Sequence, residues 1–272
     1  MGNGIAHVFA LNGFEVTLIE AKKELADKAL ATIAKNLERQ AAKGTITEAE
    51  KSAALGRLKT ALSPAEAKGF HFAVEAVSER MDLKKQIFRD LDAAAAPGAV
   101  LATNTSSLPI TEISSVVKDP SRVVGMHFMN PVPVMKLVEI IRGLQTSDET
   151  YRRVHELTLK LGKTPAAAKD FPGFISNRVL MPMINEAIFC LMEGVSSKED
   201  IDTIMKLGMA HPMGPLQLAD YIGLDVCLAI MGVLHEGFAD SKYRPCPLLK
   251  QMVQAGRLGV KSGQGFYEYK AK

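Results

Sequence analysis

Hydrophobic and polar positions follow two different rhythms along this chain, and the change falls near Lys169. Before that residue, short β-type runs alternate with helical stretches. Strands are predicted over residues 14–20, 70–77 and 100–102, and long helices over 22–42 and 82–95. Strands that are separated by helices in this order predict a parallel sheet with crossover helices.

After Pro172 the strand signals nearly disappear, and one helical stretch follows another. Helices are predicted over residues 174–192, 198–207, 216–221, 225–238 and 247–255. The junction 169–173, which contains Pro172 and Gly173, is a natural boundary between domains. We therefore predict an α/β domain over residues 1–171 and an all-helical domain over 172–272.

Two helix starts carry the spacing of a capping box, in which a hydroxyl side chain and a later glutamate bind each other's main-chain N–H groups. These pairs are Thr47 with Glu50, and Ser196 with Glu199. The first pair predicts a helix over residues 47–55, and the second predicts the start of the helix over 198–207.

The first residues carry part of a dinucleotide-binding pattern. Gly2 opens a helical stretch, and Glu20 ends the β-type run that follows. In a Rossmann βαβ unit, a glycine-rich turn brings a pyrophosphate to a helix N-terminus, and an acidic residue about 20 positions later binds the ribose hydroxyls. Glu20 favours NAD, because its carboxylate would repel the 2′-phosphate of NADP. Lys22 and Lys23 keep NADP open as an alternative.

The first strand of such a unit has no counterpart before Gly2, nor do the first two glycines of a G-x-G-x-x-G turn. That strand is normally central in the sheet. We therefore expect the strands on either side of its place to have unpaired edges. We interpret the chain as trimmed, or its start as mis-assigned.

Composition narrows the classes of function. Of the 272 residues, 47% are hydrophobic and 23% charged, and the net charge is +3. This composition indicates a globular protein, and so mild a charge does not favour nucleic acid or an anionic membrane as partner. Three cysteines without a C-x-x-C pair indicate a reducing compartment. With no apolar run near the roughly 18 residues of a spanning helix and no secretory leader pattern, we expect a soluble cytoplasmic protein.

One histidine and one glutamate are spaced to meet across a hairpin. The stretch from Arg122 to Ile141 reads as a strand, a Pro-rich turn and a strand. If the chain folds back around Pro133, His127 lies opposite Glu139. A carboxylate beside an imidazole orients it and raises its basicity, as a general base requires. A buried histidine paired with a structural glutamate is an equally good interpretation of the spacing.

A run of small polar side chains, residues 103–107, follows the predicted strand at 100–102. The carboxyl end of a strand is where α/β sheets bind ligands. The alternative is a polar turn that caps the next helix. The chain contains neither a G-x-S-x-G motif nor an H-E-x-x-H motif, so neither a hydrolase nor a metal site is indicated.

Several segments together resemble one enzyme family. They are Gly2-Asn-Gly-Ile-Ala, Asn104-Thr-Ser-Ser-Leu, Met126-His-Phe-Met-Asn-Pro-Val-Pro-Val-Met-Lys-Leu-Val-Glu, Pro172-Gly-Phe-Ile-Ser-Asn-Arg and His211-Pro-Met-Gly-Pro-Leu. The match runs from Met1 to the C-terminal Gly263-Gln-Gly-Phe-Tyr-Glu-Tyr, and the His-Phe-x-Asn-Pro and Pro-Gly-Phe segments are highly specific in combination. The chain resembles bacterial 3-hydroxyacyl-CoA (3-hydroxybutyryl-CoA) dehydrogenases and departs from them at its N-terminus.

The resemblance implies an oxidoreductase that interconverts L-3-hydroxyacyl-CoA and 3-oxoacyl-CoA with NAD(H), with short acyl chains favoured. It implies that His127 is the catalytic base, that Glu139 is its partner, and that Ser106 and Asn177 bind the reacting oxygen or the thioester side. Because Asn177 belongs to the helical domain, the reaction is expected in a cleft between the domains. The family also implies a homodimer formed through the helical domain, where the apolar residues are Met181, Met183, Ile184, Ile188 and Met192.

The resemblance also implies binding residues for cofactor and substrate. The residues implied around NAD are Met1, Gly2, Glu20, Glu79, Lys84, Asn104, Ser106, Asn130 and Lys261. Asn36 and Lys43, with Ser106, are implied for the coenzyme A substrate. Lys35, Arg39 and Lys43 fit attraction of phosphate, although a solvated charged helix face is the more common meaning of such a stripe.

Two other functions remain open from the sequence. One is a non-catalytic acyl-CoA or dinucleotide binder, inactivated by loss of the first strand. The other is a different hydroxyacid dehydrogenase, in which a lysine base would be expected; the His127 and Glu139 pair fits this function less well.

Overall fold

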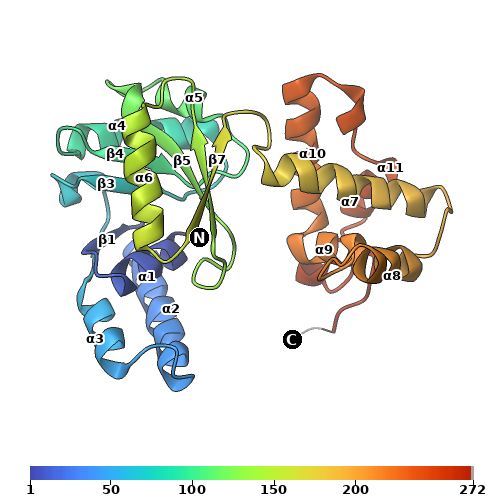
Figure 1. Cartoon of the computed structure of the whole chain (residues 1–272), viewed down its shortest axis with the longest axis horizontal. Helices are drawn as coiled ribbons and strands as arrows, with labels where there is room; N and C mark the ends of the chain where they lie inside the picture. The colour runs from blue at the N-terminus through green and yellow to red at the C-terminus, as the bar shows by residue number, and fades with distance from the viewer. Residues whose placement is uncertain (271–272) are drawn as a thin grey trace. The chain divides into compact units, whose positions relative to one another are not determined.

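The computed structural model describes residues 1–270. The chain divides into two compact units, Met1–Asp170 and Phe171–Lys272 (Figure 1). Each unit has its own hydrophobic core. The first unit contains parallel strands and crossover helices, and the second is helical. The predicted fold class is therefore confirmed.

The larger sheet of the first unit has five strands in the order β3-β4-β5-β6-β7. They are β3 (Phe72–Glu75), β4 (Val100–Thr103), β5 (Val123–Phe128), β6 (Leu137–Arg142) and β7 (Thr164–Lys169). β3, β4 and β5 are parallel, β5 and β6 form an antiparallel pair, and β7 is parallel to β6. The predicted strand, Pro-rich turn and strand are thus β5, its loop and β6.

A separate two-stranded sheet consists of β1 (Val16–Ile19) and β2 (Leu58–Ala61), which run parallel. Among the described residues, β1 pairs with β2 alone and β3 with β4 alone, so the predicted unpaired edges are confirmed. The ring of Phe9 lies 5.6 Å from that of Phe14, just before β1, and 6.0 Å from that of Phe72, the first residue of β3. The open edges of β1 and β3 therefore both begin next to the ring of Phe9.

Six α-helices accompany the two sheets of the first unit. They are α1 (Gly2–Leu11), α2 (Lys23–Ala42), α3 (Glu48–Gly56), α4 (Met81–Ala94), α5 (Ile110–Ser114) and α6 (Asp148–Lys160). Thr47 caps α3, and its hydroxyl and Glu50 form the predicted capping box.

The helices cover opposite faces of the five-stranded sheet. Phe9 of α1 and Val154 of α6 share one core cluster with Met126 of β5. Gly125 points to the other face, because successive strand residues alternate, and there a Cβ on Gly125 would meet Ile110 of α5 at 3.0 Å. His127 has the same parity as Gly125, so its side chain lies on the face that α5 covers.

Within its described residues, 171–270, the second unit packs five α-helices around one core. They are α7 (Ser176–Met192), α8 (Lys198–Gly208), α9 (Pro215–Ile222), α10 (Leu224–Phe238) and α11 (Pro247–Gln254). Short 3₁₀ turns in the two units span Pro64–Ala67, Pro120–Arg122, Ser241–Tyr243 and Val260–Ser262. No single helix in the described part of the chain passes the length and hydropathy test for crossing a membrane, and the bent pair α9 and α10 passes it jointly.

Two predicted helix starts are corrected by the structure. α7 begins at Ser176 and not at residue 174, because Gly173 and Phe174 have positive φ angles of 71° and 48°. α8 is capped by Ser197, whose hydroxyl accepts from the N–H of Asp200, and not by Ser196. Ser196 and Ser197 are adjacent, and each has an acidic residue three positions later. Ser197, with Asp200, is the one that caps the helix.

Candidate active site

His127 and Glu139 face each other across the β5–β6 pair, as the hairpin spacing predicted. They are direct partners in the antiparallel register, and Nδ1 of His127 lies 3.1 Å from Oε2 of Glu139. Both side chains are buried. Because a carboxylate accepts only, the proton of a neutral ring sits on Nδ1, and Nε2 then carries the lone pair that can take a proton.

Asn104 ties β4 to the strand that carries His127. It directly follows β4, and its Oδ1 accepts from the N–H of Phe128 at 2.9 Å. Its own N–H donates to the carbonyl oxygen of Glu75 at 2.7 Å. One predicted cofactor residue is therefore held one position away from His127.

Glu79 organises the polar turn after β4. Its Oε1 accepts from the N–H of Ser106 at 2.7 Å and from the Ser106 hydroxyl at 3.1 Å. Its Oε2 accepts from the Thr105 hydroxyl at 2.8 Å. The structure thus brings together Glu79 and Ser106, two of the predicted site residues, at the carboxyl ends of β3 and β4.

Glu75 is a buried carboxylate that the sequence analysis missed. It accepts from Lys84 Nζ at 2.8 and 3.0 Å and from the Thr103 hydroxyl at 2.7 Å. Lys84 also lies 3.4 Å from Glu79. Lys84, predicted near the cofactor, is therefore part of a buried network that links β3, α4 and β4. A glutamate at the end of an apolar strand, nine residues before a lysine on the next helix, was the available signal.

The N-terminus of α1 fits a phosphate group. Met1 is the N-cap and provides no side-chain cap, so the first N–H groups of the helix keep the positive end of its dipole. A Cβ on Gly2 would lie 3.9 Å from that of Ala76, just past β3. Glu20 directly follows β1, so Gly2 and Glu20 both lie near the carboxyl ends of parallel strands, where α/β sheets bind ligands.

The remaining predicted residues lie apart from this cluster or in the second unit. Asn36 is half-buried on α2, and Lys43 is exposed at its C-terminal end. Asn130 is exposed in the loop after β5. Asn177 is buried in the first turn of α7, and Lys261 forms an ion pair with Asp225, both in the second unit.

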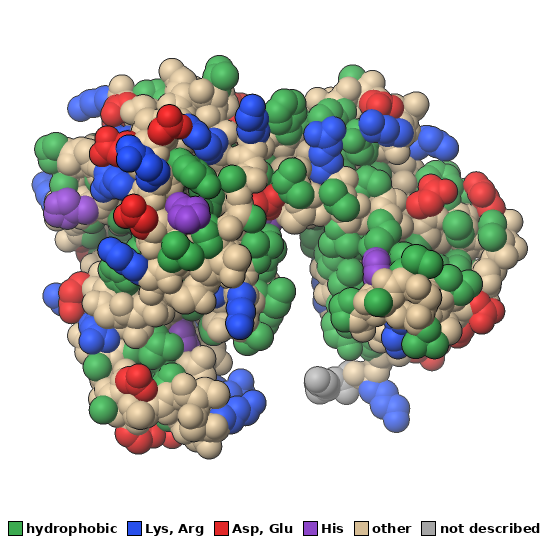
Figure 2. Space-filling view, in the orientation of Figure 1, with side chains coloured by type: hydrophobic (Ala, Val, Ile, Leu, Met, Phe, Trp, Pro, Cys, Tyr) green, Lys and Arg blue, Asp and Glu red, His purple; other side chains and the backbone are tan. Residues whose placement is uncertain are grey.

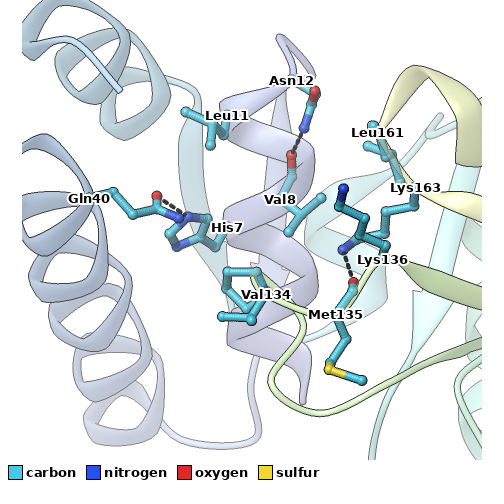
Figure 3. A pocket seen from close by; sticks show the side chains of 12 residues that line it. His7, Val8, Leu11, Asn12, Gln40, Val134, Met135, Lys136, Leu161 and Lys163 are labelled. Carbon is cyan, nitrogen blue, oxygen red and sulfur yellow. Dashed lines mark hydrogen bonds between the residues drawn. The ribbon is translucent and has the colours of Figure 1, made fainter. Parts of the chain in front are cut away.

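A pocket opens beside α1 (Figure 3). It is lined by His7 and Gln40 on one side and by Lys136 and Lys163 on the other. His7 Nε2 lies 3.0 Å from Gln40 Oε1. Burial lowers the pKa of His7, and the Gln40 contact opposes this effect. Burial also lowers the pKa of Lys163.

Comparisons with known proteins identify the family. Residues 1–171 match the family model of the 3-hydroxyacyl-CoA dehydrogenase NAD binding domain, and residues 173–269 match the model of its C-terminal domain. A relative from Bacillus subtilis is 56% identical over 272 residues, which cover 100% of this chain and 95% of the relative. The 3-hydroxybutyryl-CoA dehydrogenase of Bradyrhizobium diazoefficiens is 52% identical over 270 residues, with coverages of 99% and 92%.

Solved structures agree with the sequence matches. The (S)-3-hydroxybutyryl-CoA dehydrogenase of Ralstonia eutropha superposes with a TM-score of 0.97 at 48% identity. The superposition covers 100% of this chain and 96% of that one. The resemblance and NAD as the cofactor of the first domain are confirmed. This chain belongs to the 3-hydroxyacyl-CoA dehydrogenase family.

Proposed function

We propose that this chain interconverts L-3-hydroxyacyl-CoA and 3-oxoacyl-CoA with NAD(H). The observation that carries the proposal is the buried His127–Glu139 pair, in direct register and 3.1 Å apart. It lies in a unit that matches an NAD-binding domain. The names of the relatives, 3-hydroxybutyryl-CoA dehydrogenases, support a short acyl chain.

His127 moves the proton of the reaction. In oxidation, its Nε2 takes the proton of the substrate C3 hydroxyl. The hydrogen on Nδ1 stays on the ring and is donated to Glu139, whose negative charge stabilises the imidazolium that forms. NAD, when bound, accepts the hydride that leaves C3. In reduction, the imidazolium returns the proton to the developing alkoxide. Such acid–base help typically contributes 10²–10⁴-fold in rate.

Ser106 and Asn177 bind the reacting oxygen or the thioester side in this proposal. The hydroxyl and N–H of Ser106 both contact Glu79, which supports a fixed position for Ser106 at the carboxyl end of β4. Asn177 is buried in the first turn of α7. The Asn177 amide is a donor suited to a carbonyl or alkoxide oxygen, and the Ser106 hydroxyl becomes such a donor when it turns from Glu79 to the substrate.

The proposed cofactor residues divide by the part of NAD that they would hold. Met1 and Gly2 provide helix N–H groups for the pyrophosphate, and Glu20 provides a carboxylate for the adenine ribose. For the nicotinamide half, the proposed residues are Glu79, Lys84, Asn104, Ser106, Asn130 and Lys261.

Coenzyme A is assigned to the α2 surface. Asn36 offers an amide and Lys43 an exposed ammonium near the end of this helix, and both suit a nucleotide with phosphate groups. The proposed domain roles are NAD binding for residues 1–171 and dimerisation with substrate binding for residues 172–272.

We also propose a homodimer that forms through the second unit. Met181, Ile184 and Ile188 are buried in the core of that unit, so they do not form the interface surface. Exposed apolar side chains instead gather over α8 and its end: Ile204 is 57% exposed, Leu207 81% and Met209 61% (Figure 2). A patch of this kind is typical of a protein interface. Sedimentation at micromolar concentration is expected to give twice the chain mass, and a monomer would refute the dimer.

The cytoplasm is the proposed compartment. Cys190, Cys227 and Cys246 are free thiols, and the last two are buried. Free thiols are typical of a reducing compartment.

A non-catalytic binder of acyl-CoA or dinucleotide is the second candidate, and the open edges of β1 and β3 favour it. An unpaired edge lowers sheet stability beside the α1 N-terminus, where the cofactor would bind. The two candidates differ in turnover.

The experiment follows NADH absorbance with acetoacetyl-CoA as substrate and measures NADH binding separately by calorimetry. The dehydrogenase proposal predicts that NADH is consumed only when acetoacetyl-CoA is present. The rate of acetoacetyl-CoA reduction should be higher with NADH than with NADPH. NADH binding without any turnover of acetoacetyl-CoA would refute the dehydrogenase and support the binder.

A further inference from the structure

The loop over residues 129–136 joins the two strands that carry the reactive pair. His127 lies near the end of β5 and Glu139 near the start of β6, so this loop determines how the two strands meet. Inside it, the N–H groups of Val134 and Met135 both donate to the carbonyl oxygen of Pro131, each at 3.0 Å. These internal bonds tighten the loop but leave other carbonyl groups to be satisfied from outside.

Lys163 binds this loop from the far side of β6. Its Nζ donates to the carbonyl oxygen of Val132 at 2.7 Å and to that of Met135 at 2.7 Å. Figure 3 shows the bond to Met135. Lys163 is 7% exposed, and both of these partners are main-chain carbonyl oxygens rather than carboxylates. The ammonium therefore fixes the course of the main chain and does not form an ion pair with these partners.

The backbone around Lys163 is itself fixed to β6. Lys163 directly precedes β7, and the N–H of its neighbour Thr164 donates to the carbonyl oxygen of Lys136 at 2.8 Å. β7 then runs parallel to β6 over its whole length, with Ala166 opposite Glu139. The lysine thus reaches the loop from a strand that is in register with Glu139.

The same loop also packs against α1. Val132 is buried, and a Cβ on Gly4 would meet its Cβ at 3.0 Å. The residue whose carbonyl oxygen Lys163 holds is therefore in close contact with the first turn of α1. Asn130 precedes it by two residues. One ammonium thus controls a loop that touches the proposed phosphate site and connects the reactive pair.

We propose that Lys163 is a positioning residue for the reaction, which rests on the proposed function. By bonding Val132 and Met135, it holds the loop in the one conformation that aligns His127 with Glu139 and packs Val132 against the first turn of α1. Loss of both bonds leaves two carbonyl groups without this donor, and the loop then samples other conformations.

The test replaces Lys163 by Met, which keeps the length of the side chain and removes its donors. Lys136→Met is the matched control. Lys136 lines the same pocket but is exposed, and this substitution removes one positive charge, as Lys163→Met does. We expect Lys163→Met to lower kcat for acetoacetyl-CoA reduction by about tenfold or more, because small misplacements of reacting groups have effects of this size. KM should change much less. Lys136→Met should keep the wild-type kcat, and Lys163→Arg should regain part of the loss.

A second measurement needs no substrate. Amide hydrogen exchange at Val134 and Met135 should accelerate in Lys163→Met and not in Lys136→Met. A folded Lys163→Met variant with wild-type kcat would overturn the proposal. A lower kcat and melting temperature with unchanged exchange at the two amides would also overturn it, since the effect would then be a general loss of stability. An inactive wild-type chain would refute the proposed function instead, and the exchange comparison would still decide whether Lys163 holds the loop.

Discussion

At the scale of single residues, buried polar side chains in the first unit are held by specific partners. Glu139 meets His127, Glu75 meets Lys84 and Thr103, and Lys163 meets two carbonyl groups. Removing one member of such a pair leaves the other buried without its partner, which costs about 1–3 kcal/mol for a neutral group and more for a charge. These contacts therefore determine both stability and the geometry available for chemistry.

His7 makes stability depend on pH. Burial lowers its pKa below the ordinary value of 6.5, so the unfolded chain binds a proton at a higher pH than the folded chain does. The contribution of neutral His7 to the free energy of unfolding is fully present above about pH 6.5. It is lost as the pH falls from there toward the pKa of His7 in the folded chain. The loss is at most about 1.4 kcal/mol per pH unit.

The prediction is measured by urea unfolding, followed by circular dichroism, at about pH 7.5 and about pH 5.5. The difference in unfolding free energy between the two conditions should be smaller in His7→Asn than in the wild type. The exposed His71→Gln serves as control and should keep the wild-type difference. Equal differences in His7→Asn and the wild type would show that His7 does not contribute to this dependence.

At the scale of elements, the open edges of β1 and β3 are the most unusual feature of the first unit. The N–H groups of Val16 and Glu20 donate to carbonyl oxygens of Arg57 and Ala61 on the β2 side. Successive N–H groups along a strand point to opposite sides. The N–H groups of Thr17 and Ile19 therefore point away from β2. By the same argument, His71 and Glu75 accept from the β4 side, and the N–H groups of Phe72 and Val74 point away from β4.

Amide hydrogen exchange tests this arrangement directly. The outward amides of Thr17 and Ile19 should exchange at least about tenfold faster than the inward amide of Leu18 in the two-stranded sheet, because local opening is not required. In the five-stranded sheet, the outward amides of Phe72 and Val74 should likewise exchange faster than the inward amide of Ala73. Equal protection of outward and inward amides would contradict the open edges.

Elements with strong local signals were predicted well from the sequence. The position of Pro133 midway between His127 and Glu139 gave the hairpin register, which the structure confirms. β2 was missed, because four residues, Leu-Lys-Thr-Ala, are too short to show a period. Glu75 was missed for a related reason, since its burial depends on Lys84 and Thr103, which reach it only in the folded sheet.

At the scale of the whole molecule, the chain consists of two units with separate cores, and the predicted site residues are divided between them. The first unit contains the reactive pair, the α1 N-terminus and the Glu79 turn. The second contains Asn177 and Lys261, which were inferred from the family resemblance and had no spacing signal of their own. The proton-transfer claim therefore rests on the first unit, where the geometry is internal to one sheet.

The most direct test of the central claim is the rate of acetoacetyl-CoA reduction by NADH in the wild type, His127→Gln and His71→Gln. If His127 moves the proton, His127→Gln should lose about 10²–10⁴-fold in kcat and still bind NADH, whereas His71→Gln should match the wild type. A His127→Gln variant that keeps more than about a tenth of the wild-type kcat would contradict the account.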